Sequence, residues 1–103
     1  MLPAAIFCSN DIALGIAFDP AKRQVTLDSR CLDMARAEAI FDDNVLTVAD
    51  ERMDYGEPRF ISIGRLDGRM VVLVWTPRGG DRRIISMRKA NEREQSAYGP
   101  RLD

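Results

Sequence analysis

Arginine is the residue type in this sequence whose number and placement could do chemistry. The 103-residue chain has 15 basic side chains, and 13 of these are Arg. A planar guanidinium donates two parallel hydrogen bonds to a phosphate or a carboxylate, which an ammonium group does not do. Nine of the basic residues lie between positions 59 and 93. They are Arg59, Arg65, Arg69, Arg78, Arg82, Arg83, Arg88, Lys89 and Arg93. The predominance of Arg over Lys favours a surface that binds a polyanion.

The charge is divided unevenly along the chain. Residues 1–58 carry 5 basic and 11 acidic side chains, whereas residues 59–103 carry 10 basic and 5 acidic ones. The formal net charge of −1 therefore hides an acidic first part and a basic second part. Such asymmetry indicates a polyanionic partner. The alternative, which the sequence leaves open, is that these Arg residues are solvated at strand edges and helix faces.

The chain contains no His. This absence excludes Ser-His-Asp and Cys-His catalysis, His-ligated zinc and a His general base, so an enzyme built on this chain must use carboxylates, Arg, Lys, Tyr or Ser. The two cysteines, Cys8 and Cys31, match no metal spacing, and we expect two half-buried thiols rather than a disulfide. No nucleotide-binding glycine motif is present, so no cofactor and no metal is expected.

A single domain over residues 16–103 is expected, preceded by an N-terminal extension over residues 1–15. The longest apolar run, residues 70–75, is far shorter than the roughly 20 residues that span a membrane. The first residues lack the basic start of a signal peptide. These features predict a cytoplasmic protein without a membrane partner.

The elements that must position the basic residues follow from periodicity and capping signals. Residues 16–18 are predicted as a strand, followed by a helix over 20–29 with Asp19 as N-cap and Pro20 at its first position. A second helix is predicted over 34–41 with Asp33 as N-cap. Strands are predicted over 45–49, 59–65, 70–76 and 82–87, with Asp67-Gly68 as a hairpin turn. A last helix is predicted over 88–98, ended by Gly99-Pro100.

This order predicts an α+β fold. Tight turns should join the strands into an antiparallel meander sheet of four or so strands, with two N-terminal helices and one C-terminal helix. Because side chains alternate along a strand, Arg59 and Arg65 should share one face of the sheet. Arg83 is predicted to join them from the last strand, and Arg82 to point the opposite way.

Several segments together resemble the BrnT toxins of bacterial type II toxin–antitoxin systems. Residues 16–22 resemble the opening of that family, and residues 37–43 its A-x-x-(V/I)-F-D-D segment. Residues 56–65 are similar to its G-E-x-R-(F/Y)-x-x-I-G signature. Residues 76–80 and 83–90 resemble its T-x-R-G and R-I-I-S-A-R-x-A segments, and Glu92-Arg93 with Tyr98 its ending. The resemblance covers about residues 16 to 98, in the family's order.

The resemblance implies a RelE-like fold and a ribonuclease that acts on RNA, either with the ribosome or independently of it. It also implies a cognate BrnA-type antitoxin that carries a ribbon-helix-helix domain. The complex would repress its own promoter, so promoter DNA would be contacted only through the antitoxin.

Metal-free RNA cleavage needs a base, an acid and groups that stabilise the charge on phosphorus. Within the resemblance, Glu57 is the predicted base, and Arg65, Arg83 and Arg88 are predicted to stabilise the charge. RNA binding is predicted for Lys22, Arg30, Arg59, Arg78 and Tyr98, of which Lys22, Arg30 or Tyr98 could also act as the acid.

The chain departs from the family at two positions where members carry His. Residues 29–31 read Ser-Arg-Cys where members commonly read Lys-His-Gly, and Met53 stands where many have His. Two alternatives follow: a catalytically degenerate module that only binds an antitoxin or RNA, and a nonspecific RNA-binding domain.

Overall fold

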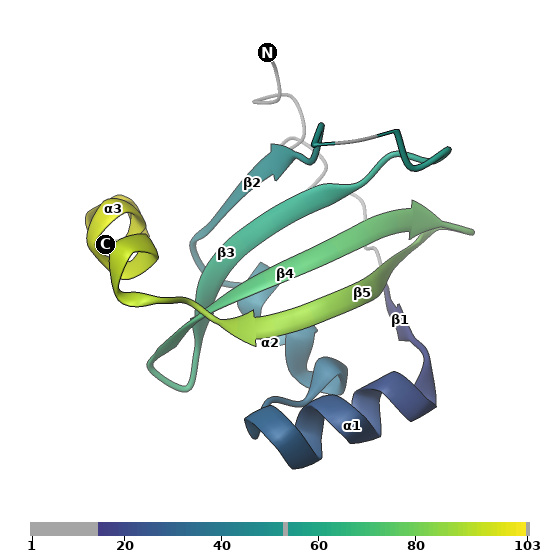
Figure 1. Cartoon of the computed structure of the whole chain (residues 1–103), viewed down its shortest axis with the longest axis horizontal. Coiled ribbons are helices and arrows are strands. Elements are labelled where there is room, and N and C mark those ends of the chain that lie inside the picture. The colour runs from purple at the N-terminus through teal and green to yellow at the C-terminus, as the bar shows by residue number, and fades with distance from the viewer. Residues whose placement is uncertain (1–14, 53, 103) are drawn as a thin grey trace.

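A single curved sheet, flanked by helices, forms the framework of the molecule (Figure 1). The computed structural model describes residues 15–52 and 54–102. In chain order the elements are β1 (Gly15–Phe18), α1 (Pro20–Arg30), the 3-10 turn η2 (Met34–Arg36), α2 (Ala37–Phe41), β2 (Val45–Ala49), β3 (Phe60–Leu66), β4 (Arg69–Arg78), β5 (Asp81–Lys89) and α3 (Glu92–Leu102). The predicted α+β class is confirmed. Of the predicted N-terminal extension, residues 1–15, only Gly15 lies within the described residues, and it begins β1.

The sheet has five strands in the order β1-β5-β4-β3-β2. Strands β2 to β5 form the predicted antiparallel meander. The expectation of a four-stranded, wholly antiparallel sheet is wrong, because β1 pairs with β5 in parallel, with Gly15 opposite Asp81 and Phe18 opposite Ile84. A parallel pair needs a long crossover. Here residues 19–80 form this crossover, and no local signal in the sequence indicates that the two strands pair.

The predicted starts of the first two helical segments are confirmed. Asp19 Oδ1 accepts a hydrogen bond from the Ala21 N–H at 3.0 Å, and Pro20 fills the first helical position. Asp33 caps the second helical segment by accepting from the Ala35 N–H at 2.9 Å. That segment opens as the 3-10 turn η2 and continues as α2, where the sequence predicted one continuous helix.

Two hairpin turns join β3 to β4 and β4 to β5. Asp67 and Gly68 have φ values of 53° and 82°, and Gly79 and Gly80 have values of 60° and 86°. Positive φ at both central residues defines the type I′ turn, whose twist matches that of paired strands. The predicted Asp67-Gly68 turn is therefore confirmed.

The prediction of a helix over 88–98 is wrong at both ends. Arg88 and Lys89 belong to β5, and α3 runs from Glu92 through Gly99 and Pro100 to Leu102. Pro100 lies in the last turn of the helix and has no N–H to donate to the carbonyl four residues earlier, so the helix does not owe its length to this residue. Leu102 is buried against the sheet, and its carbonyl accepts a hydrogen bond from Asn44 Nδ2 at 2.9 Å. These contacts extend the helix past its expected stop.

Two hydrophobic cores lie on opposite faces of the sheet. The larger one packs η2 and α2 against β3, β4 and β5, and includes Leu32, Met34, Ile40, Leu73 and Trp75. The smaller one packs the C-terminal helix α3 against the other face. Its buried members are Ile63, Met70, Val72, Ala90 and Leu102. Because successive strand residues alternate between faces, β4 contributes Val71, Leu73 and Trp75 to one core and Met70 and Val72 to the other.

Gly64 provides a test of the close contact between β3 and α2. A Cβ atom at this position would lie 2.6 Å from Ile40 Cγ2, inside the main core. We expect Gly64→Ala to lower the free energy of unfolding by about 1–3 kcal/mol, as overpacking does, measured by urea denaturation. Gly99→Ala is the matched control, because its Cβ would make an ordinary contact of 3.6 Å with Met70 Cε. An unchanged urea midpoint for Gly64→Ala would contradict this packing.

Candidate functional site

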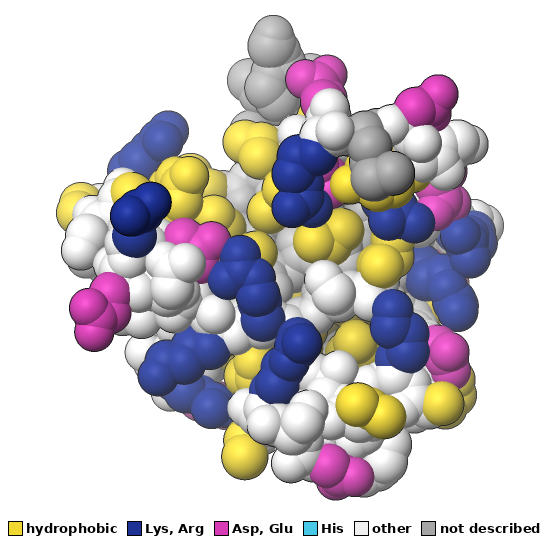
Figure 2. All heavy atoms as spheres, viewed as in Figure 1, with side chains coloured by type: hydrophobic (Ala, Val, Ile, Leu, Met, Phe, Trp, Pro, Cys, Tyr) yellow, Lys and Arg dark blue, Asp and Glu magenta, His cyan; other side chains and the backbone are white. Residues whose placement is uncertain are grey.

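The residues that the structure describes cover only part of the sheet face opposite η2 and α2. The smaller core under α3 fills one end of this face. Beyond it, Ile61 and Val74 remain half-buried and Val48 is 51% exposed. We call this uncovered area, with the basic residues around it, the open face. Figure 1 looks onto it, and in Figure 2 Lys and Arg side chains are spread across it with hydrophobic side chains between them.

A β-bulge in β5 brings Arg83 and Arg88 to this one face. Thr76 pairs with Arg83 and Val74 with Ser86, but Trp75 pairs with Ile84, so Ile85 is an extra residue without a partner on β4. Without the bulge, two residues five positions apart would point to opposite faces. The predicted placement of Arg83 on this face is confirmed by its pairing with Thr76.

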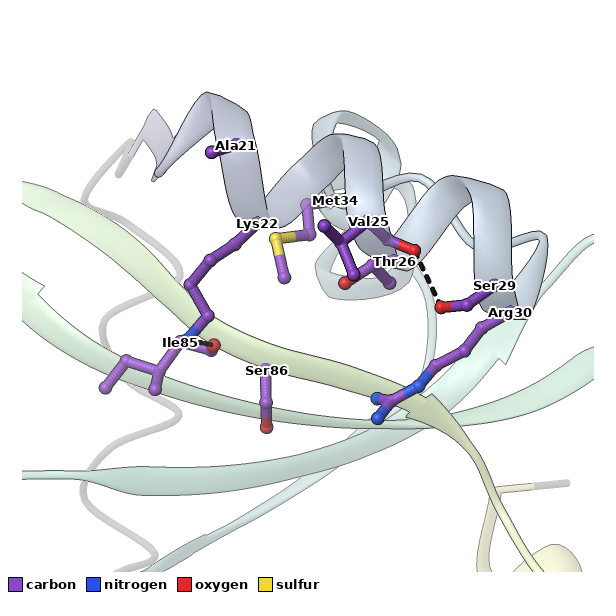
Figure 3. Close-up of a pocket in the computed structure, with 9 residues that line it drawn as sticks. All are labelled: Ala21, Lys22, Val25, Thr26, Ser29, Arg30, Met34, Ile85 and Ser86. Carbon is purple, nitrogen blue, oxygen red and sulfur yellow. Dashed lines mark hydrogen bonds between the residues drawn. The ribbon is translucent and has the colours of Figure 1, made fainter.

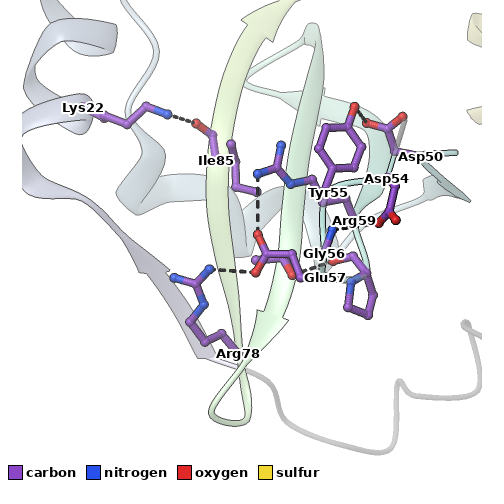
Figure 4. Close-up of polar contacts among 11 residues, drawn as sticks. Lys22, Asp50, Asp54, Tyr55, Gly56, Glu57, Arg59, Arg78 and Ile85 are labelled. Carbon is purple, nitrogen blue, oxygen red and sulfur yellow. Dashed lines mark hydrogen bonds and ion pairs between the residues drawn. The ribbon is translucent and has the colours of Figure 1, made fainter. Parts of the chain in front are cut away.

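Glu57 sits between two guanidinium groups at one end of the open face (Figure 4). Its Oε1 accepts a hydrogen bond from Arg78 Nη2 at 2.8 Å, and its Oε2 lies 3.5 Å from Arg59 Nη2. The hydrogen bond from Arg78 is the main reason that the pKa of Glu57 is lowered, and the charge of Arg59 adds to the effect. Glu57 keeps 27% of its side-chain surface exposed, so its carboxylate stays accessible.

The loop between β2 and β3 holds this cluster in place. The guanidinium of Arg59 stacks 4.1 Å from the centre of the Tyr55 ring, and the Tyr55 hydroxyl donates to Asp50 at 3.2 Å. Asp50 has a fully buried side chain and accepts two hydrogen bonds of 2.8 Å from Arg52. The Arg52 hydrogen bonds lower the pKa of Asp50 to about 2. The ring, the carboxylate and the two guanidiniums thus restrict the conformations of the loop that carries Glu57.

Arg83 lies one strand away from this cluster. It lies directly opposite Thr76 on β4. The Thr76 hydroxyl donates a hydrogen bond to the carbonyl of Pro58, the residue after Glu57. Its side chain is half-buried, and among residues 15–52 and 54–102 it makes no hydrogen bond or ion pair. It is therefore a guanidinium with its donors open to an anion.

Arg88 is already paired. It donates two hydrogen bonds of 2.8 Å to the carboxylate of Glu94, and these raise its pKa. Glu94 also accepts from the Asn91 N–H at 2.9 Å, while Asn91 Oδ1 accepts from the Glu94 N–H at 2.8 Å. This reciprocal pair is a capping box at the start of α3. Arg52 lies close enough for its charge to oppose the pKa shift of Arg88, so two guanidiniums approach each other across the open face.

The predicted catalytic residues do not meet at one point. Arg65 is six residues from Arg59, about 20 Å along an extended strand, and its Nη2 lies 3.4 Å from the Gly99 carbonyl of α3. Glu57 and Arg83 occupy one end of the open face, Arg88 lies further along β5, and Arg65 lies beside α3.

The predicted RNA-binding residues also lie at separate places on the molecule. Arg59 and Arg78 hold Glu57. Lys22 and Arg30 reach from α1 to the outer edge of β5, where they donate to the carbonyls of Ile85 and Met87. Tyr98 packs on the smaller core under α3.

Sequence reasoning missed Arg52 as a member of the open face, because the local sequence indicates a loop but not the face to which its side chains point. Arg82 points to the other face, as predicted, where its guanidinium stacks 4.1 Å from the Phe41 ring. Burial lowers the pKa of Arg82.

Within the described part of the chain, no group of three or more Cys, Asp or Glu is arranged to hold a metal ion. In the same residues, no helix is long and apolar enough to cross a bilayer.

Comparison with known families decides the class of protein to which this arrangement belongs. Residues 18–94 match the model of a family described as the ribonuclease toxin BrnT of type II toxin–antitoxin systems. The chain belongs to the BrnT family. No match was found among curated proteins. The matched BrnT segment runs from the end of β1 into α3 and contains Glu57, Arg83 and Arg88, whereas Tyr98 lies beyond it. Members of the BrnT family are ribonuclease toxins that are paired with an antitoxin.

The Asp50–Arg52 pair predicts acid sensitivity of this BrnT-family fold. The pKa of Asp50 lies below its unfolded value, so its contribution to stability is complete above about pH 4 and is lost as the pH falls towards about 2. We expect the urea midpoint of Asp50→Asn to fall less steeply over this range than that of the parent chain. The control is Glu51→Gln, an exposed neighbour, which should follow the parent curve. Parallel curves for all three proteins would contradict this role of Asp50.

Proposed function

We propose that this chain is an endoribonuclease that cleaves RNA at the open face without a metal ion. The observation that carries the proposal is the Glu57 carboxylate, held by Arg59 and Arg78, with the uncommitted guanidinium of Arg83 on the next strand of the same face. A carboxylate can take a proton, and planar guanidiniums bind phosphate oxygens. This set of groups is suited to phosphodiester cleavage by the neighbouring 2′-hydroxyl.

The reaction proposed for this site is an internal transfer. Glu57 removes the proton of the 2′-hydroxyl, and the 2′-oxygen forms a bond to phosphorus. The bond from phosphorus to the 5′-oxygen then breaks, and a solvent water supplies the proton that this oxygen needs. The products are a 2′,3′-cyclic phosphate and a 5′-hydroxyl. Arg78, Arg83 and Arg59 stabilise the charge that develops on the phosphate oxygens.

Water is the proposed acid because of where the other candidates lie. Lys22 and Arg30 are hydrogen-bonded to backbone carbonyls at the outer edge of β5, and Tyr98 packs under α3. In this proposal Arg88 and Arg65 bind the RNA backbone away from the cleaved bond. Their distance along the sheet from Glu57 supports that division.

The ion pairs around Glu57 also give the site a way to respond to RNA. In the absence of RNA, Glu57 is a weak base, because Arg78 and Arg59 lower its pKa. An RNA phosphate competes for the same guanidinium donors. When it draws Arg78 away from Glu57, the pKa of the carboxylate rises, so binding of the substrate itself strengthens the base.

The proposed partner is a BrnA-type antitoxin with a ribbon-helix-helix domain, through which alone promoter DNA is contacted. A RelE-like relationship of the fold and a cytoplasmic location belong to the same proposal. The antitoxin pairing and the RNA substrate class of the family support it. The rival is a degenerate module that binds without cleaving, because the chain has no His.

Cleavage of total RNA in EDTA tests the proposal. We expect Arg83→Ala and Glu57→Gln each to slow cleavage by about 100-fold or more, the cost of removing one stabilising or proton-transfer group at a pre-organised site. Arg93→Ala is the matched control, because Arg93 is exposed on α3 away from Glu57, and its rate should be unchanged. If the parent chain cleaves no faster than Arg83→Ala, the binding-only alternative is correct.

The pH dependence of kcat/KM tests the base separately. Since the pKa of Glu57 in the free enzyme is lowered, the carboxylate stays ionised down to below the ordinary value of about 4.3. We expect cleavage to be lost only as the pH falls below that value, and Arg78→Ala to move the acidic limb to higher pH. An acidic limb near neutral pH would point to a different base.

A further inference from the structure

Among the described residues, no strand lies beside the second half of the outer edge of β5. Strand β1 covers this edge only as far as Ile84, which lies opposite Phe18. Beyond it, the Ile85 carbonyl accepts a hydrogen bond from Lys22 Nζ at 2.7 Å (Figure 3), and the Met87 carbonyl accepts one from Arg30 Nη1 at 2.8 Å. Two long side chains of α1 therefore occupy backbone acceptors that a neighbouring strand would otherwise use.

An apolar groove lies between α1 and this edge. It encloses about 430 Å³ and is lined largely by carbon atoms, with Ala21, Val25 and Met34 on the helical side and Ile85 and Ser86 on β5. Val25 is 65% exposed, although it is a large apolar residue. Figure 3 shows Lys22 and Arg30 at the two ends of the groove, reaching from the helix to the strand. The groove thus combines an apolar floor, a free strand edge and a cation at each end.

These features match an extended polypeptide better than RNA. Residues i and i+2 of an added strand present N–H donors about 6.6 Å apart, the spacing of two carbonyls on one edge of a strand. The RNA backbone offers phosphate acceptors and only the 2′-hydroxyl as a donor, so it pairs poorly with carbonyl oxygens. An apolar lining also favours a side chain over a sugar or a phosphate.

We propose that the groove between α1 and β5 is the docking site for an extended segment of the antitoxin. This inference rests on the antitoxin pairing within the proposed function. The segment adds as a strand beside Ile85 and Met87 and places an apolar side chain against Val25. Acidic residues of the segment bind Lys22 and Arg30, which the added strand releases from the two carbonyls.

The position of the groove explains how docking there blocks the site. Ser86 lines the groove, and on β5 it lies between Arg83 and Arg88, the two residues that reach the open face. An acidic strand along β5 places negative charge beside both guanidiniums and repels RNA phosphates. Inhibition then needs no contact with Glu57.

Opposite charges at position 25 test the inference. Val25→Glu and Val25→Lys remove the same apolar side chain from an exposed helical position, so both should fold. With the antitoxin encoded beside this gene as the probe, we expect Val25→Glu to raise Kd about tenfold or more, since like charges repel. Val25→Lys should bind within about threefold of the parent chain. Hydrogen exchange should show new protection of the amides in residues 84–88 when the antitoxin is added.

The other outcomes identify other occupants. Equal Kd values for the two variants, or protection only on α3, would overturn the inference. A change in RNA binding by Val25→Glu that matches its change in antitoxin binding would assign the groove to RNA. A dimer of the free chain that Val25→Glu dissociates would assign it to a second copy. Because binding is measured without cleavage, an inactive parent chain contradicts the proposed ribonuclease activity and leaves this test intact.

Discussion

The extra residue at Ile85 is the constraint on which the rest of the site depends. It changes the alternation of side chains within β5, so that Ile84 and Met87 both enter the main core while Arg83 and Arg88 both reach the open face. A regular strand would bury one of the two guanidiniums under the helices, at a large cost in desolvation. The same residue presents its carbonyl to Lys22 at the point where β1 ends. One irregularity therefore brings two guanidiniums to the basic face and also supplies a carbonyl acceptor at the outer strand edge.

Carboxylates position most of the guanidiniums around the open face. Glu57 holds Arg78 and Arg59, Asp50 holds Arg52, and Glu94 holds Arg88. These pairs are partly exposed, so each contributes modestly to stability. Their larger effect is to order long side chains before a ligand arrives, which reduces the entropy lost on binding. Arg83 differs from them in making no such pair among the described residues, so an anion can bind it without displacing a carboxylate.

Much of the fold could be predicted from the sequence, because its signals are local. Asp19-Pro20 and Asp67-Gly68 encode a helix start and a turn through their own backbone preferences. The parallel pairing of β1 and the bulge at Ile85 could not be predicted, because both depend on contacts between distant segments. The end of the last helix was misplaced for a similar reason, since Leu102 is held by the sheet and by Asn44. Within the site, the pairing of Glu57 with Arg59 could be predicted because the two residues are close in the sequence. The position of Arg52 on the open face could not, because it depends on how its loop folds.

The pairing of β1 with β5 has a consequence for the order in which the molecule can form. Gly15 at one end of the described chain meets Asp81 near the other, so the sheet is completed only after β5 has been synthesised. Contacts between such distant segments form late, and chains fold from the N-terminus as they are synthesised. Arg83 and Arg88 also belong to this last strand. A nascent chain therefore assembles the basic surface of the open face only after β5 has been synthesised, because two of its guanidiniums belong to that strand.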